Sequence, residues 1–71
     1  MVKNNIKLFR TEAGLTQEQF AKKLRITRQT VIAIENHHYN PSLELALKIS
    51  EFFNTNVESI FILEEDESSA N

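Results

Sequence analysis

Apolar residues recur at the spacing of an α-helix near the start of the chain. Ile6, Phe9 and Ala13 follow positions i, i+3 and i+7 and therefore fall on one face of a helix. Gly14 comes directly afterwards, and glycine readily adopts the left-handed conformation that ends many helices. The pattern predicts a first helix over residues 5–13.

Two more helices follow, and each begins after a residue whose side chain can cap it. Thr16 opens a capping box with Gln19, which predicts a second helix that ends near Arg25. Thr27 is the next cap and predicts a third helix over residues 28–36. The apolar residues that we assign to the inner faces of these two helices are Phe20, Ala21, Leu24, Val31 and Ile34.

Two further helices are predicted in the second half of the chain, after a polar loop that ends in Pro41. Ser42 caps a fourth helix, and Asn56 caps a short last helix over residues 57–61. The residues that we assign to the apolar face of the fourth helix are Leu43, Ala46, Leu47, Ile49 and Phe53. Five short helices, with no strand alternation in the body of the chain, predict an all-α bundle.

The second and third predicted helices are separated by only Arg25, Ile26 and Thr27. So short a connection is typical of a helix-turn-helix motif, here residues 17–36. At about 100° per residue, the third helix also has an outward face, opposite its apolar one. That outward face consists of Arg28, Gln29, Ile32, Ala33 and Asn36. Its first two side chains suit guanine and adenine edges in the major groove of DNA.

Composition narrows the classes of function. The chain has 71 residues and no cysteine, which indicates one small domain without a disulfide or a cysteine-based zinc site. So small a core does not enclose a substrate pocket of roughly 300–1,000 Å³. Ser42, Ser50 and Ser59 are interpreted as helix caps or helix positions, so we expect no enzyme and no cofactor. His37 and His38 are adjacent and have no evident third ligand, so we expect no metal site.

The charge is unevenly distributed along the chain. The net charge of −2 argues at first against nucleic acid, but four acidic residues form one block over residues 64–67, and the rest of the chain carries +2. Half of the basic residues fall within seven positions, at Lys22, Lys23, Arg25 and Arg28. They fit either a solvated helix face or a DNA-binding surface. We therefore predict a mildly basic domain over residues 1–63, which contains the helix-turn-helix, and an acidic, disordered tail over residues 64–71.

A set of motif residues runs through the helix-turn-helix and the loop after it. It comprises Leu15-Thr16-Gln17-Glu18, Ala21, Leu24, Ile26, Thr27-Arg28-Gln29-Thr30-Val31, Ile34-Glu35-Asn36 and Tyr39-Asn40-Pro41-Ser42-Leu43. This set resembles the Cro/CI (XRE) family of helix-turn-helix regulators, and in particular its small cytolysin-repressor-type members. The resemblance covers residues 3–63. It implies a lambda-repressor-like bundle whose third helix, the recognition helix 28–36, lies in the major groove of double-stranded DNA.

The resemblance also implies which residues contact the DNA. Four residues of the recognition helix are implied to contact bases, namely Arg28, Gln29, Ile32 and Ala33. Six residues are implied to contact phosphates, namely Gln17, Thr27, Asn36, His38, Tyr39 and Asn40. Thr27 is a helix cap in the first place. Tyr39 fits equally well a place in the core, and Ile32 fits either a thymine methyl or a dimer surface.

Two further positions concern the framework. Many relatives have glycine in the turn where this chain has Arg25, so we expect Arg25 at positive φ, at a cost of about 1 kcal/mol, and as a candidate phosphate contact. The resemblance also implies an ion pair between Arg10 and Glu35 across the bundle. Arg10 is therefore expected to be structural and not a DNA contact.

The end of the chain indicates a dimer. Phe61-Ile62-Leu63 has no helical period and favours extended structure. The resemblance implies that this segment pairs with residues 1–3 in a short antiparallel ribbon. We expect a homodimer through the last helix and this segment, with the interface formed by Val57, Ile60, Phe61, Ile62 and Leu63.

These observations predict a sequence-specific transcriptional regulator, a repressor, that binds a palindromic operator as a homodimer. The alternative is a protein-binding module on the same fold, such as an antitoxin or adaptor, which would use residues 61–63 and the acidic tail. We expect no interaction with a membrane, because no apolar run approaches the length of a membrane span. No small-molecule ligand is evident from the sequence either, so we expect none. The expected location is the cytoplasm of a prokaryote, in association with the nucleoid, or a phage-infected cell.

Overall fold

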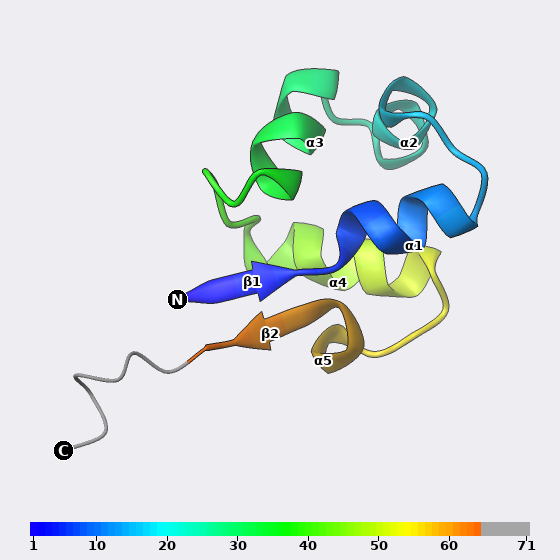
Figure 1. Cartoon of the computed structure of the whole chain (residues 1–71). Helices are drawn as coiled ribbons and strands as arrows, with labels where there is room; N and C mark the ends of the chain where they lie inside the picture. The colour runs from blue at the N-terminus through cyan, green and yellow to red at the C-terminus, as the bar shows by residue number, and fades with distance from the viewer. Residues whose placement is uncertain (65–71) are drawn as a thin grey trace, which may run out of the picture.

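A computed structural model describes residues 1–64 as five helices and a two-stranded antiparallel sheet (Figure 1). The helices are α1 (Ile6–Glu12), α2 (Gln17–Leu24), α3 (Arg28–Glu35), α4 (Leu43–Phe52) and α5 (Val57–Ile60). The strands are β1 (Val2–Asn4) and β2 (Phe61–Leu63), which together form the terminal ribbon. The predicted five-helix fold with a short ribbon is therefore confirmed. The acidic tail predicted over residues 64–71 lies outside the described residues, except for Glu64.

Side-chain caps begin four of the five helices where the sequence predicts them. Thr16, Thr27, Ser42 and Asn56 each accept a hydrogen bond from a backbone N–H three residues further on, at 2.9–3.1 Å. At α2 the backbone N–H of Thr16 also donates to Gln19 Oε1 at 2.9 Å, which completes the capping box. These caps satisfy N–H groups that a helix leaves without an internal partner.

Four helices end at a residue with left-handed backbone. Gly14, Arg25, His37 and Asn54 have φ values of 74°, 59°, 62° and 53°. At each of them, two successive N–H groups donate back to carbonyls of the last helical turn, which is the Schellman pattern. The expected positive φ of Arg25 is thus confirmed. A side chain other than glycine costs about 1 kcal/mol in this conformation, and asparagine, as at Asn54, tolerates it better than most residues.

The core lies where the helices meet, and every helix contributes to it. Its fully buried cluster is Ile6, Phe20, Ala21, Val31, Ile34, Ile49 and Ile60. Three further phenylalanines, Phe9, Phe52 and Phe53, extend this cluster around Phe20, with neighbouring ring centroids 5.0–5.7 Å apart. Figure 1 places α2 and α3 together at one end of the molecule, and the terminal ribbon with α5 at the other. The core therefore lies between a helical end, formed by α2 and α3, and an end that contains the two strands.

Helix α4 corrects the assignment of its apolar face. Leu43 and Leu47, expected to point inward, are 74% and 51% exposed. Ala46 and Ile49 are buried as predicted, Phe53 packs against the core, and the buried position that was not predicted is Ser50. Leu47 lies about 100° around the helix from Ala46, so only one of the two can face the core directly. Ser50 is tolerated there because its hydroxyl donates to the carbonyls of Ala46 and Leu47 at 3.1 and 3.0 Å.

The C-terminal strand of the ribbon has the expected bounds, whereas the N-terminal strand covers residues 2–4 and not the expected residues 1–3. Its residue pairs are Val2–Leu63, Lys3–Ile62 and Asn4–Phe61. The backbone N–H of Glu64 donates to the Met1 carbonyl at 2.8 Å, so Glu64 still belongs to the pairing and not to the tail predicted over residues 64–71. Within the described residues, the pairing of the two chain ends thus includes Met1 and Glu64, because the Met1 amino group also donates to the Glu64 carbonyl at 3.2 Å.

Helix α5 also corrects part of the expected dimer surface. Ile60 is fully buried in the core, because the single turn of α5 directs it inward, so it has no surface to offer a partner. Val57 and Phe61 are half-buried. Ile62 and Leu63 are exposed, Leu63 by 74%. The apolar surface at this end is therefore carried by β2.

Candidate nucleic-acid interface

Helix α3 presents two different faces, because its caps and its buried residues fix its rotation. Val31 and Ile34 point into the core, each with 1% exposure. Of the four residues expected to contact bases, Arg28 and Gln29 are exposed, whereas Ile32 and Ala33 are half-buried. The outward face predicted from the helical spacing is therefore present at the start of α3.

The first residues of α2 and α3 meet at one open hollow of about 440 Å³. It is lined by Arg10, Thr16, Gln17, Glu18 and Arg28. Gln17, the expected phosphate contact, and Arg28, the expected base contact, thus lie at the same depression. The charge of Arg28 and the N-terminus of α2 both favour an anion at this place, whereas the carboxylate of Glu18 in the same lining opposes one.

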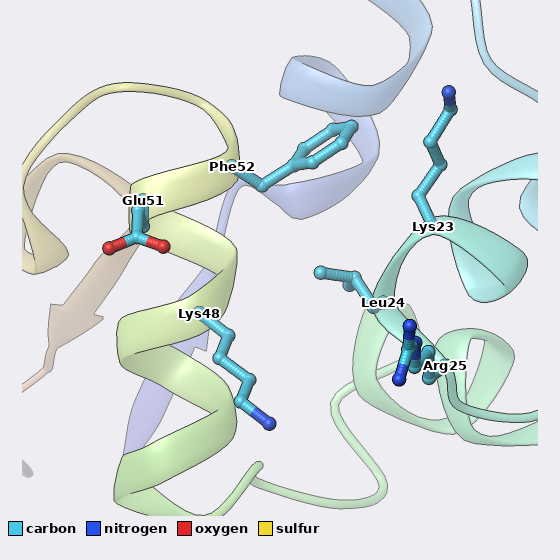
Figure 2. A pocket seen from close by; sticks show the side chains of 6 residues that line it. All are labelled: Lys23, Leu24, Arg25, Lys48, Glu51 and Phe52. Atoms are coloured by element: carbon cyan, nitrogen blue, oxygen red, sulfur yellow. The ribbon is translucent and has the colours of Figure 1, made fainter.

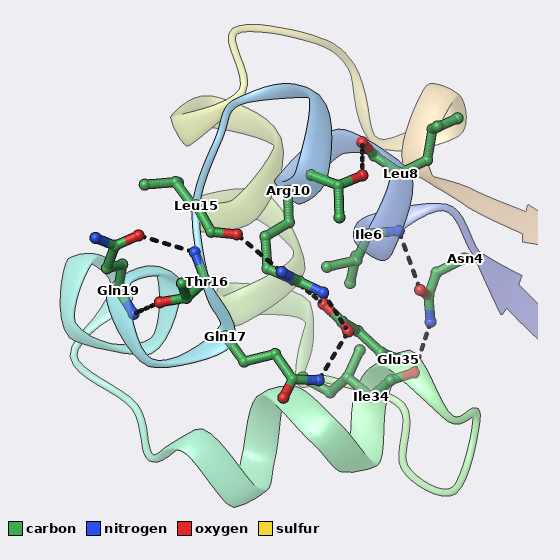
Figure 3. A network of polar contacts seen from close by, with 11 residues as sticks. Asn4, Ile6, Leu8, Arg10, Leu15, Thr16, Gln17, Gln19, Ile34 and Glu35 are labelled. Atoms are coloured by element: carbon green, nitrogen blue, oxygen red, sulfur yellow. Dashed lines mark hydrogen bonds and ion pairs between the residues drawn. The ribbon is translucent and has the colours of Figure 1, made fainter.

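A buried ion pair holds this region to α1. Arg10 Nε lies 2.7 Å from Glu35 Oε2, and Arg10 Nη2 donates to Glu35 Oε1 at 3.2 Å (Figure 3). Their side chains are only 9% and 3% exposed. Arg10 Nη1 also donates to the Leu15 carbonyl at 2.8 Å. The pair implied by the resemblance is therefore present, and Arg10 uses three of its nitrogens within the fold.

Gln17 is tied into the same network. Its Nε2 donates to Glu35 Oε1 at 3.2 Å, so one carboxylate joins α1, α2 and the end of α3 (Figure 3). The second hydrogen of that amide and the backbone N–H at the start of α2 are the groups that Gln17 can direct toward a phosphate. The network therefore fixes the side chain of Gln17 relative to α3.

The remaining expected phosphate contacts lie at the start of α3 or after its end. Thr27 Oγ1 accepts from Thr30 N, so Thr27 is primarily a cap. Asn36 is the C-cap of α3, and the exposed His38 and Asn40 follow it in the loop. Tyr39 is 46% exposed, which places its ring at the surface and not in the core. Asn36, His38, Tyr39 and Asn40 are therefore exposed at the end of α3 and on the loop that follows it.

One residue of this region was not singled out by the sequence. Asn4, at the end of β1, donates from Nδ2 to the Ile34 carbonyl at 2.9 Å (Figure 3). Its Oδ1 accepts from Ile6 N at 3.2 Å. Nothing local in the sequence predicts this bridge, because the partner on α3 is 30 residues away.

A second open groove lies between the end of α2 and α4 (Figure 2). It has a volume of about 420 Å³ and is lined by Lys23, Leu24, Arg25, Lys48, Glu51 and Phe52. Figure 2 shows the ring of Phe52 directed toward α2, while the carboxylate of Glu51 points to the other side of α4. Three cations therefore surround an apolar floor at this place.

Neither a metal-binding cluster nor a membrane span is found in the described part of the chain, residues 1–64. No group of three histidine or acidic side chains there is placed to hold a metal ion. No helix in that range has the length and apolar character needed to cross a membrane.

Two capped helices joined by a three-residue turn, with an exposed cation at the start of the second, define a helix-turn-helix protein. Residues 6–60 match the helix-turn-helix family, and the chain belongs to that family. This assignment agrees with the Cro/CI-type motif residues of the sequence.

Similar proteins come from archaea and bacteria. An uncharacterized HTH-type transcriptional regulator of Methanocaldococcus jannaschii is 54% identical over 66 residues, which cover 93% of this chain and all of that protein. Another, YgzD of Bacillus subtilis, is 46% identical and is covered over 98% of its length. The crystal structure of a proposed DNA-binding protein from Bacteroides fragilis superposes with a TM-score of 0.76 at 23% identity, and the matched region covers 86% of this chain and 98% of that one. That structure shows the shared fold.

Proposed function

We propose that this protein is a sequence-specific DNA-binding transcriptional regulator whose helix α3 enters the major groove. The observation that carries the proposal is the exposed first turn of α3, where Arg28 and Gln29 make no side-chain hydrogen bond or ion pair with any residue of the range 1–64. The core does not need these polar side chains. The relatives of M. jannaschii and B. subtilis, described as transcriptional regulators, support the same function.

The chemistry of the outward face assigns roles to its residues. The guanidinium of Arg28 matches the O6 and N7 acceptors of guanine, and the amide of Gln29 matches adenine. Ile32 and Ala33 are half-buried and offer apolar contact to a thymine methyl. Phosphate contacts on either side would fix the register of α3, and they are proposed for Gln17, Thr27, Asn36, His38, Tyr39 and Asn40.

We further propose that the protein binds a palindromic operator as a homodimer. One short helix reads few base pairs, and a two-fold dimer would place two α3 helices at half-sites about 34 Å apart. Exposed Ile62 and Leu63, beside exposed Met1, support the terminal ribbon as the contact surface. Two strands are marginal as a sheet, and a second copy would extend it to four. Repression is the simplest outcome, because occupation of the operator is sufficient for it.

The groove of Figure 2 favours a second candidate function, a protein-binding module. Phe52 is 38% exposed there, and Lys23, Arg25 and Lys48 surround it. Charge complementarity points to an acidic segment of a partner protein with one apolar anchor. In that case Lys48→Glu would strongly weaken binding of a synthetic Glu-rich peptide carrying one phenylalanine. It would leave DNA binding intact, because Lys48 lies on α4 and is not among the proposed DNA contacts.

Selection of bound duplexes from a random DNA pool tests the main proposal. We expect the protein to enrich one palindromic sequence, and the Arg28→Ala, Gln29→Ala double variant to lose that enrichment while it remains folded by circular dichroism. Enrichment of no sequence by the wild-type protein would contradict sequence-specific binding and favour the protein-binding module.

A further inference from the structure

The side chain of Asn4 joins three elements that are far apart in the sequence. It leaves β1 at the residue paired with Phe61 of β2. Its oxygen accepts from the first N–H of α1, at Ile6, and its nitrogen donates to the Ile34 carbonyl in the last turn of α3. Asn4 is half-buried, so both hydrogen bonds are partly shielded from water.

This contact is a specific one between the ribbon and the recognition helix. Among residues 1–64, no other side-chain hydrogen bond joins the terminal ribbon to α3. The Ile34 carbonyl belongs to the Schellman turn that ends α3, where it also accepts from His37 N at 3.0 Å. The carbonyl end of a helix favours hydrogen-bond donors, because its dipole is negative there.

The neighbouring asparagine provides an internal comparison. Asn5 is the N-cap of α1, yet its side chain makes no capping hydrogen bond. The acceptor comes from Asn4 instead. The carboxamide of Asn4 thus has two separable functions, because its oxygen caps α1 and its nitrogen holds α3.

We propose that Asn4 is a positioning residue for operator recognition, which couples the terminal ribbon to the recognition helix through its Nδ2–Ile34 hydrogen bond. The inference rests on the proposed function, in which the ribbon forms the dimer and α3 reads the DNA. A dimer fixes the distance between two ribbons, and Asn4 transmits that geometry to the end of α3 and to the loop from Asn36 to Asn40. Recognition requires such side chains to be held within about 0.5 Å of the productive geometry.

The substitution Asn4→Asp separates the two functions of the side chain. It keeps an oxygen for Ile6 N, removes the donor, and turns a second oxygen toward the Ile34 carbonyl. Asn5→Asp is the matched control, because it adds the same charge one residue away without removing a side-chain hydrogen bond of the cap. Asn4→Ala, which removes both bonds, is compared with Asn5→Ala.

The experiment measures the Kd of each variant for the duplex selected by the wild-type protein and for a scrambled duplex, well below the melting temperature. Sedimentation verifies the dimer, and the amide NMR signals of residues 35–38 report on the end of α3. We expect Asn4→Asp to bind the selected duplex about 3- to 10-fold more weakly than Asn5→Asp, as expected for one lost hydrogen bond. The scrambled duplex should bind both variants equally. The signals of residues 35–38 should shift only in Asn4→Asp.

Equal affinity of Asn4→Asp and Asn5→Asp for the selected duplex would overturn the inference. So would a loss by Asn4→Asp that is the same for both duplexes, since a merely structural defect has that effect. If the wild-type protein selects no duplex at all, the proposed function itself fails. That outcome is distinguishable, because it appears without any substitution.

Discussion

The α2–α3 end and the ribbon end of the molecule are held together by different means. At the α2–α3 end the stabilising contacts are mostly local, with caps that reach three residues and a turn of three residues. The ribbon instead pairs residues about 60 positions apart, through two strands of three residues each. It also leaves Ile62 and Leu63 exposed. The first end is specified by neighbouring residues, whereas the second depends on the closed fold and, we propose, on another copy.

Each end nevertheless has one side-chain contact between residues that are far apart in the sequence. Arg10 and Glu35 connect α1 to the end of α3 through a buried ion pair, and Asn4 connects the ribbon to the same turn. The last turn of α3 is therefore where both ends of the molecule meet. Substitutions at each end test how far the two ends differ.

The largest effect is expected from Glu35→Ala, which breaks the buried pair. It leaves the Arg10 guanidinium without its carboxylate in a site with little solvent, and such losses cost about 3–5 kcal/mol of the free energy of unfolding. Urea denaturation of the variant and the wild-type protein measures the loss in the free energy of unfolding. Glu44→Ala is the control, because the Glu44–Lys48 pair at 3.1 Å is exposed and should be worth about 0.5 kcal/mol or less. Similar losses in both variants would show that the buried pair has no special role.

At the ribbon end, Ile62→Asp combined with Leu63→Asp should give a folded monomer. We expect binding to the selected operator to weaken about 100-fold, because two separate monomers, and no longer one dimer, must bind the two half-sites. Sedimentation and gel shift measure the two effects. Leu43→Asp with Leu47→Asp is the control, since these residues expose similar apolar surface on α4. If that control dissociates the dimer and the ribbon variant does not, the interface lies on α4.

Arg28→Ala tests the reading surface of the α2–α3 end. It should lose about 1–3 kcal/mol of discrimination at one base position of the operator. His38→Ala should instead weaken binding to all sequences about equally, because a phosphate contact carries no information about the base. Binding titrations on single-base variants of the operator at three salt concentrations distinguish them. A uniform loss from Arg28→Ala would make it a phosphate contact.

The comparison of the two ends also explains what could be predicted from the sequence. The caps at Thr16, Thr27, Ser42 and Asn56 are local signals, and each begins its helix as predicted. The inward positions of Val31 and Ile34 follow from helical spacing alone. For this reason the helix-turn-helix and the outward face of α3 follow from the amino-acid sequence alone.

What could not be predicted depends on contacts between distant residues. Leu43 and Leu47 have the right spacing for an apolar face, but the neighbours that decide which side of α4 is covered come from other helices. The assignment of Ile60 to a dimer surface is wrong, because the sequence alone does not show which apolar residues are buried in the core. Asn4 belongs to no sequence motif, and only the folded chain brings it close to the Ile34 carbonyl on α3.

The smallest expected effect concerns the turn between α2 and α3. Arg25 adopts a φ of 59°, which an L side chain adopts at a cost of about 1 kcal/mol relative to glycine. Arg25→Gly removes that cost but adds freedom to the unfolded chain, so we expect a net gain of about 0.5 kcal/mol. Gly14→Ala is the converse test, because φ is 74° there and a Cβ would meet nothing within 4 Å, so any loss is conformational. Thermal denaturation should show Arg25→Gly more stable and Gly14→Ala less stable than the wild type. If Arg25→Gly is less stable instead, the Arg25 side chain contributes more to stability where it lines the groove between α2 and α4 than its backbone conformation costs.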